Sequence, residues 1–300
     1  MTHPDQTIPH HIGELRGAEG DKIVADFYGS SGKPVLLLHG GGQTRHAWGG
    51  AARALARSGY LAVTIDQRGH GDSDWSHLAH YKYAHFAQDL TIISDQLAER
   101  TGNRPVIITA SYAGLSTLLA VGRYRAAHGR DLVSALVIVD MSLTQDPEGT
   151  AKIRGFLRAS PNGFATLDEA ADAVAAYMPH RPRPSNTKGL QKNLRLHADG
   201  RWRWHWDPLF MDGPDAIDTD RDAIDAELRA TSASLHFPVM LVRGGSSELI
   251  MEDHARDFLN LATHAEYVDV AGARHMLVGD ANDQFTTCVV EFLGRVHSND

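Results

Sequence analysis

The chain has 300 residues, of which 42% are hydrophobic and 22% charged, and its formal net charge is −8 at pH 7. This length suits one large α/β domain with an insertion or two small domains, and the composition excludes disordered and membrane-spanning classes. The acidic balance, with no Lys/Arg cluster, gives no basis for a polyanionic partner, so we expect no nucleic-acid binding.

The single cysteine, Cys288, excludes a disulfide within the chain. The first residues lack the basic and then apolar pattern of a secretion signal, and no apolar run is long enough to cross a bilayer. We therefore expect a cytoplasmic protein without membrane attachment.

Strand and helix patterns alternate from about residue 23 to residue 140. Short β-branched and apolar runs, typical of strands, occupy residues 23–28, 34–38, 60–65, 106–109 and 135–139. Helical spacing of apolar residues follows at 46–58, at 84–99 and directly after Ser111. This alternation predicts a mostly parallel, twisted sheet with helices on both faces.

The alternation stops after Asp140. Residues 142–235 contain helical patterns such as 167–178, a Pro/Arg loop and a tryptophan-rich stretch, but no strand suited to a core sheet. Strand and helix patterns return at 238–242, 253–262, 266–270 and 284–296. We predict an α/β core formed by residues 1–141 and 236–300. A helical cap, residues 142–235, is inserted between core strands and lies over their carboxyl ends, where ligands bind.

The segment Thr109-Ala110-Ser111-Tyr112-Ala113-Gly114 lies where an apolar strand turns into a helix. It resembles the G-x-S-x-G nucleophile elbow, in which a sharp turn exposes the serine hydroxyl beside backbone N–H groups. The two usual glycines are replaced here by Thr109 and Ala113. A serine in such a turn can also act only as a helix cap, so the interpretation depends on its partners.

A serine nucleophile needs a base and an acid that orients that base. Two candidates follow later strands: Glu248 in the loop after residues 238–242, and His275 in the loop after the last strand. We predict a triad of Ser111, His275 and Glu248. Asp140, which also ends a strand, is the alternative acid.

The glycines of His39-Gly40-Gly41-Gly42 directly follow a buried strand. Such a loop leaves backbone N–H groups free, so we expect the amides of Gly41 and Tyr112 to form an oxyanion hole. A dinucleotide-binding loop would need a third glycine at position 45, which is Arg45.

The stretch 201–208 alternates arginine and tryptophan, which predicts an extended segment with its tryptophans on one face. We expect a substrate pocket to include Trp204 and Trp206 from this stretch, together with Gly42 and Met276. His77, His80 and His85 have loose metal-like spacing, but the sequence offers them no firm carboxylate partner. We therefore interpret them as solvent-facing and predict no metal site.

Together these motifs resemble the α/β-hydrolase superfamily, in particular its capped serine hydrolase branch of esterases, epoxide-hydrolase-like and haloperoxidase-like enzymes. The resemblance rests on four segments and the elbow at Ser111: residues 39–42, 66–73, 244–248 and 272–275. The order serine, acid, histidine is that of this superfamily. The segment 66–73 is expected to form a turn that braces the site.

The resemblance implies a serine hydrolase that cleaves an ester, thioester or lactone of a small to medium apolar substrate through an acyl-enzyme. It needs no cofactor, and its partner is a small molecule. The aspartate-nucleophile branch is excluded because position 111 is serine. The alternatives are a perhydrolase or haloperoxidase-like activity, C–C bond hydrolysis with the same triad, or a non-catalytic binding protein. The sequence leaves the oligomeric state open.

Overall fold

The computed structural model describes residues 8–183, 186–273 and 282–297. Its main sheet has eight strands in the order β1-β2-β4-β3-β5-β6-β9-β10. β2 pairs antiparallel with both β1 and β4, and the remaining pairs are parallel. The strands are β1 (His10–Arg16), β2 (Lys22–Tyr28), β3 (Pro34–Leu38), β4 (Leu61–Ile65), β5 (Val106–Ala110), β6 (Ala135–Val139), β9 (Val239–Gly244) and β10 (Glu266–Val270).

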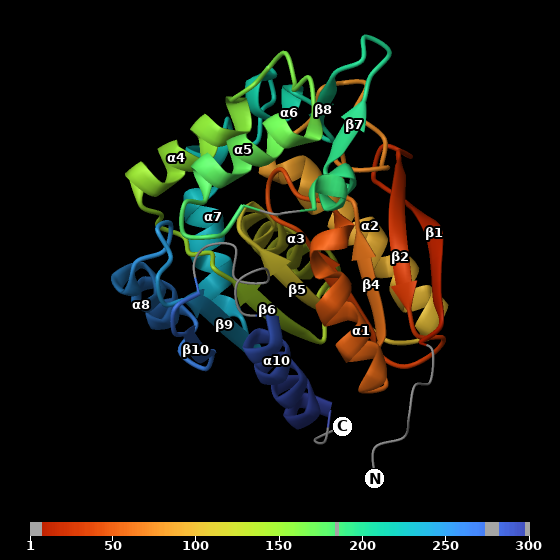
Figure 1. The fold of residues 1–300 in the computed structure, drawn as a ribbon. Coiled ribbons are helices and arrows are strands. Elements are labelled where there is room, and N and C mark those ends of the chain that lie inside the picture. Colours follow the sequence, from red (N-terminus) through yellow and green to blue (C-terminus); the bar gives the residue numbers. More distant parts are fainter. Residues whose placement is uncertain (1–7, 184–185, 274–281, 298–300) are drawn as a thin grey trace.

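Helices cover both faces of this sheet, as expected (Figure 1). The core helices are α1 (Gly49–Arg57) after the short η1 (Arg45–Trp48), α2 (Tyr83–Thr101), α3 (Tyr112–His128), α7 (Arg221–Ser234), α8 (Glu252–Leu261) and α10 (Asn282–His297). Side chains of β3 point alternately to the two faces of the sheet. Leu36 and Leu38 pack with α2 and α3, whereas Val35 and Leu37 pack with α1 and α10. All five residues of β3 are buried because both faces are covered, which explains the continuous apolar run.

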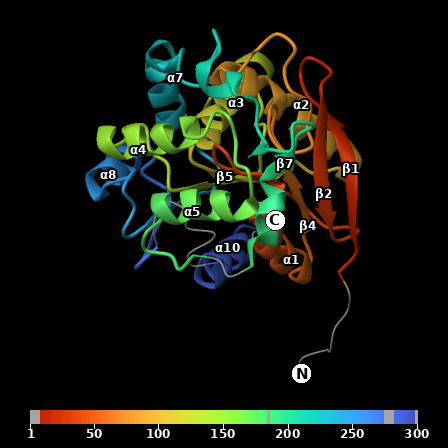
Figure 2. The same cartoon turned by 45° about the horizontal axis from the view of Figure 1, so that its top comes forward.

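Most of the segment between β6 and β9 lies along one edge of the sheet (Figures 1 and 2). It contains α4 (Pro147–Arg158), α5 (Leu167–Tyr177), η2 (Thr187–Lys192), β7 (Leu194–Leu196), β8 (Trp202–Trp204) and α6 (Leu209–Asp212), followed by α7. Asp146 and Thr166 cap the first two helices by accepting hydrogen bonds from the N–H groups of Gly149 and Glu169.

Three features of the fold were not predicted. β1 is an exposed edge strand with little apolar alternation, so its sequence does not distinguish it from a loop. The 142–235 segment contains a two-stranded sheet, β7–β8, which is separate from the main sheet. In addition, α7, at the end of the predicted cap, packs against α3 of the core.

Candidate active site

Ser111 lies between β5 and α3 in a backbone conformation that is rare for a side-chain-bearing residue. Its φ is 55° and its ψ is −131°, and such a conformation costs of order 1–3 kcal/mol. The turn is held by the Ser111 N–H, which donates to the carbonyl of Val139 at 3.2 Å, and by the Ser111 carbonyl, which accepts from Gly114 N–H at 2.9 Å. This is the strand–turn–helix geometry of a nucleophile elbow.

Thr109 and Ala113, which replace the usual glycines, are accommodated in the core. Both are fully buried. Thr117 donates from its hydroxyl to the carbonyl of Ala113 at 2.7 Å and lies 3.5 Å from the Thr109 hydroxyl. The close approach occurs at Gly114, where an added β-carbon would lie 2.5 Å from Cε of Met141. The elbow therefore forms without the two glycines.

The glycine loop after β3 lies beside Ser111 because β3 is the strand from which the chain order diverges, with β4 on one side and β5 on the other. A β-carbon at Gly40 would lie 3.4 Å from Cβ of Ser111. Among the hydrogen bonds of the described residues, none uses the Gly41 N–H. Tyr112 is the first residue of α3, so its N–H has no acceptor within the helix. These two amides are available to an oxyanion.

Two buried histidines support the glycine loop. Gln67 N–H donates to Nε2 of His39 at 3.1 Å, so Nδ1 of His39 carries the proton and donates to the Gly40 carbonyl at 2.8 Å. Gly42 N–H lies 3.4 Å from Nε2 of His70, whose Nδ1 donates to the Arg68 carbonyl at 3.0 Å. Burial lowers the pKa of His39 to about 4 and, with His39 nearby, that of His70 to about 3. Both imidazoles are therefore neutral near pH 7.

We expect these histidines to make folding sensitive to mild acid. In the unfolded chain their pKa is about 6.5, so between pH 6.5 and pH 4 the unfolded chain binds protons that the folded chain excludes. The free energy of unfolding then falls as pH decreases, by up to about 1.4 kcal/mol per pH unit for each histidine. Urea unfolding measured from pH 7.5 to pH 4.5 checks this. His70→Gln should reduce the slope, whereas the exposed control His77→Ala should not. An unfolding free energy that stays constant between pH 7 and pH 5 would contradict the expectation.

The segment 66–73 forms the predicted bracing turn. Asp66 accepts hydrogen bonds from the backbone N–H and the guanidinium of Arg45 and from Asp72 N–H. Ser73 Oγ donates to the Asp66 carbonyl at 2.5 Å. Arg45 also lies 3.2 Å from Asp26 and 2.8 Å from Asp72. Against the effect of burial, Asp66, Asp72 and Asp26 together raise the pKa of Arg45.

The two candidate acids have different surroundings. Asp140 directly follows β6, is 1% exposed and has a φ of 46°. Its Oδ1 accepts from Gly244 N–H at 3.0 Å and its Oδ2 accepts from Ser247 Oγ at 2.6 Å, so it is held beneath the loop after β9. The Glu248 side chain, by contrast, is 39% exposed and lies 3.2 Å from Lys152 Nζ of α4.

A cavity of about 390 Å³ opens above Ser111, between the loops after β3 and β5 and the segment 142–235. Ser111, Gly41, Gly42 and Tyr112 line it. Most of its wall is apolar and comes from α4, α5, β8 and α6, including Ile153, Phe156, Leu157, Val174, Met178, Trp204, Phe210 and Met211.

The sequence matches known proteins along most of its length. Residues 33–281 match the sequence profile of the family described as alpha/beta hydrolase fold. The chain belongs to this family.

Relatives of this alpha/beta hydrolase include esterases. It is 30% identical over 263 residues to the esterase Rv0045c of Mycobacterium tuberculosis, an alignment that covers 86% of this chain and 81% of the relative. A solved structure of that esterase superposes with a TM-score of 0.73 and 25% identity, covering 97% of this chain and 93% of the other. A non-heme chloroperoxidase from Kitasatospora aureofaciens is 24% identical over 292 residues, covering 92% of this chain and 98% of the relative. The fold and the esterase relatives make this protein a hydrolase.

In this alpha/beta hydrolase, the remaining residues of the predicted substrate pocket differ in whether they line the cavity. Trp204 lines the cavity, whereas Trp206 does not: it is 5% exposed and stacks behind Trp204 with ring centroids 5.0 Å apart. His275 and Met276 lie outside the described residues. Sequence reasoning missed the ion pair between Arg154 and Asp218, 2.5 Å apart in the cavity wall. Arg154 belongs to α4 and Asp218 to the loop between α6 and α7, and no local motif marks either residue.

The interpretation of the three neighbouring histidines needs correction. His77 is exposed as expected, but His80 and His85 are half-buried and have carboxylates beside them. These carboxylates come from Glu19 and Asp215, which are far away in sequence, so no spacing pattern could indicate them.

None of the helices in the described ranges combines the length and the apolar character that crossing a bilayer requires.

Proposed function

We propose that this alpha/beta hydrolase cleaves a carboxylic ester, thioester or lactone through an acyl-enzyme formed on Ser111. The observation that carries the proposal is the strained backbone of Ser111 beside the cavity, next to the amides of Gly41 and Tyr112. Strain of this kind persists where the surrounding structure imposes it, and it concentrates at active sites.

In the proposed reaction, His275 removes the proton of Ser111 as its Oγ attacks the substrate carbonyl. The N–H groups of Gly41 and Tyr112 donate to the oxyanion of the tetrahedral intermediate, where one such donor is worth about 3–4 kcal/mol. His275 then donates the proton to the leaving alcohol or thiol. Water, activated by the same imidazole, hydrolyses the acyl-enzyme and restores Ser111.

Of the two candidate acids, the geometry favours Asp140. A triad acid is a buried carboxylate whose position is fixed by hydrogen bonds, and Asp140 receives one from Gly244 N–H and one from Ser247 Oγ. The Glu248 side chain lies partly exposed and contacts Lys152 of α4. This position suits an ion pair that links the cap to the core. Asp140 is therefore the acid that we propose, in place of Glu248.

The cavity supports a small to medium, largely apolar substrate. Its volume of about 390 Å³ lies near the lower end of the range for small-molecule sites. The aliphatic and aromatic side chains of α4, α5 and α6 favour an apolar acyl or alkyl group, while Arg154 and Asp218 supply a polar point on the wall.

Perhydrolase activity is a second candidate, supported by the non-heme chloroperoxidase relative, which aligns with 92% of this chain. It would use the same acyl-enzyme, with hydrogen peroxide in place of water as the attacking species. Comparing peracid formation with hydrolysis, on one ester with and without peroxide, distinguishes the two activities.

We expect the purified protein to react with a fluorophosphonate probe at one site per chain and to hydrolyse p-nitrophenyl esters. Because the cavity is apolar and bounded, the ratio kcat/KM should rise from acetate to an intermediate acyl length and then fall. Mass spectrometry locates the labelled residue, and a chromogenic assay gives the rates. If folded protein neither reacts with the probe nor turns over any ester of the series, the hydrolase proposal fails and the alternative of a non-catalytic binding protein is favoured.

A further inference from the structure

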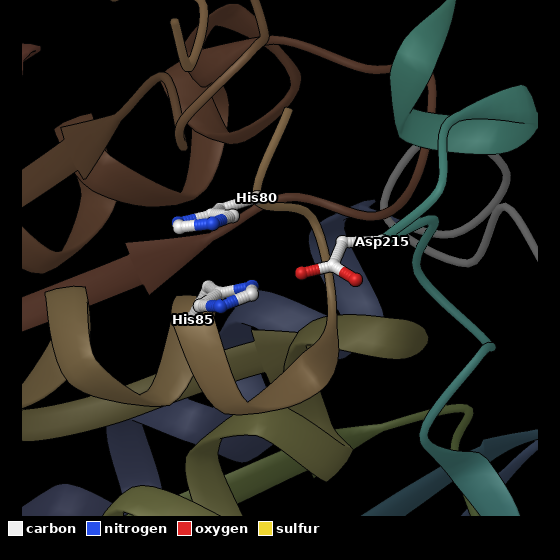
Figure 3. Close-up of side chains that lie close together, drawn as sticks. All are labelled: His80, His85 and Asp215. Atoms are coloured by element: carbon white, nitrogen blue, oxygen red, sulfur yellow. The ribbon is translucent and has the colours of Figure 1, made fainter. Parts of the chain in front are cut away.

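His80, His85 and Asp215 form a cluster on the side of the molecule where the segment 142–235 meets the core. One possible ligand atom from each residue lies within 4.8 Å of those of the other two. His80 precedes α2, His85 lies in the first turn of α2, and Asp215 follows α6. Figure 3 shows the two imidazole rings face to face with the Asp215 carboxylate beside them.

The backbone holds these residues in place. His80 and Asp215 form an isolated parallel β-bridge, and Tyr81 N–H donates to the Asp215 carbonyl at 2.9 Å. The two imidazole rings stack with centroids 4.3 Å apart and an interplanar angle of 9°. Because the backbone is fixed, the distances between the three side chains can change by side-chain rotation alone.

The imidazole nitrogens and the carboxylate oxygen of the cluster are ligand atoms that a transition-metal cation accepts. Nδ1 of His85 is buried and has no hydrogen-bond partner among the residues that the structure describes, which is costly for a ring nitrogen. Nδ1 of His80 lies 2.6 Å from Oε1 of Glu19. A carboxylate bonded to an imidazole is the usual partner of a metal-binding histidine.

We propose that His80, His85 and Asp215 bind a divalent transition-metal ion such as Zn²⁺, Ni²⁺, Co²⁺ or Cu²⁺. Two imidazoles and a carboxylate are ligands that these ions accept, whereas Mg²⁺ and Ca²⁺ require mostly oxygen. Metal–ligand bonds of about 2.0–2.2 Å require the three side chains to draw closer by about 1 Å. The ion must also compete with Lys82, whose Nζ lies 2.5 Å from Oδ1 of Asp215.

Metal binding at this site would fix the segment after α6 to the start of α2. Tyr83, between the two histidines, and Ile217 and Asp218, just after Asp215, all line the cavity above Ser111. An ion bound outside the cavity would therefore link the two segments that carry these lining residues. We expect bound metal to stabilise the fold and to change KM more than kcat, because the ligands lie away from the reacting atoms.

Isothermal titration of untagged protein with ZnCl₂, and thermal unfolding with and without Zn²⁺, test the proposal. We expect saturable binding of one ion and a Tm that rises with Zn²⁺ concentration and returns to its starting value with EDTA. With Co²⁺, d–d absorption bands in the visible range would report imidazole and carboxylate coordination, independently of any enzyme activity.

His85→Ala and Asp215→Asn should each weaken Zn²⁺ binding by at least about tenfold, while His77→Ala, three residues before His80 in the same loop, should bind like the wild type. The Tm of each variant without metal shows whether it is folded, and two independent variants guard against the failure of one. Absence of Zn²⁺, Co²⁺ and Ni²⁺ binding to the wild type would overturn the proposal. So would unchanged affinity in both variants, which would place the ion elsewhere. Because titration does not measure hydrolysis, this result is separate from that of the proposed activity.

Discussion

Ser111→Ala is expected to lower kcat for ester hydrolysis by about 10³–10⁶-fold and to abolish fluorophosphonate labelling. Removing a serine nucleophile leaves only the rate enhancement that substrate binding and the oxyanion hole provide. The alanine side chain lacks only the hydroxyl. The elbow, which is held by backbone hydrogen bonds to Val139 and Gly114, should therefore persist. Steady-state kinetics and labelling followed by mass spectrometry measure the effect.

Ser116→Ala is the matched control for this experiment. Ser116 lies in the same helix, α3, and its buried hydroxyl has no hydrogen-bond partner within the described parts of the chain. The substitution should therefore leave kcat within a few-fold of the wild type. Substantial turnover in Ser111→Ala, or labelling at another residue, would show that Ser111 is not the nucleophile.

Asp140→Asn is expected to lower kcat by about 10³–10⁴-fold, whereas Glu248→Gln should change it by less than about threefold. Replacing the triad aspartate with its amide removes the charge that orients the imidazole and stabilises its protonated form. Asparagine retains an oxygen that can accept from Gly244 N–H, so the loop after β9 should keep its position. Glu248→Gln removes the charge of a half-exposed carboxylate from its ion pair with Lys152, and an exposed pair of this kind is worth about 0–1 kcal/mol.

Kinetics of both variants, with urea unfolding of each, decide between the two acids. A large loss in Glu248→Gln with little change in Asp140→Asn would restore Glu248 as the triad acid. Equal and small effects would mean that neither carboxylate orients the base. Unfolding measurements separate either outcome from loss of structure, because a defect in orientation lowers kcat without lowering the free energy of unfolding to the same degree.

Much of the core could be predicted because its signals are local. Strands such as Pro34–Leu38 and Ala135–Val139 are buried on both faces, so their apolar runs are continuous and their ends are sharp. Ser111 could be located because a short strand and a helix adjoin it directly in the sequence. β1 could not be predicted because its exposed residues carry no pattern that depends on burial.

The sequence by itself thus determined the fold class, the candidate nucleophile and the glycine loop, since each depends on residues that are adjacent in the chain. Only the tertiary structure decided which partners Asp140, Glu248 and Asp215 contact. β6 and β9 are neighbours in the sheet although about 100 residues separate them. This pairing brings the loop after β9 to the end of β6, where Ser247 donates to Asp140, while Glu248 of the same loop contacts Lys152. In the same way, Asp215 reaches His80 and His85 through the packing of the segment after α6 against the start of α2. Such pairings depend on long-range strand order and helix packing, which leave no periodic signal in the sequence.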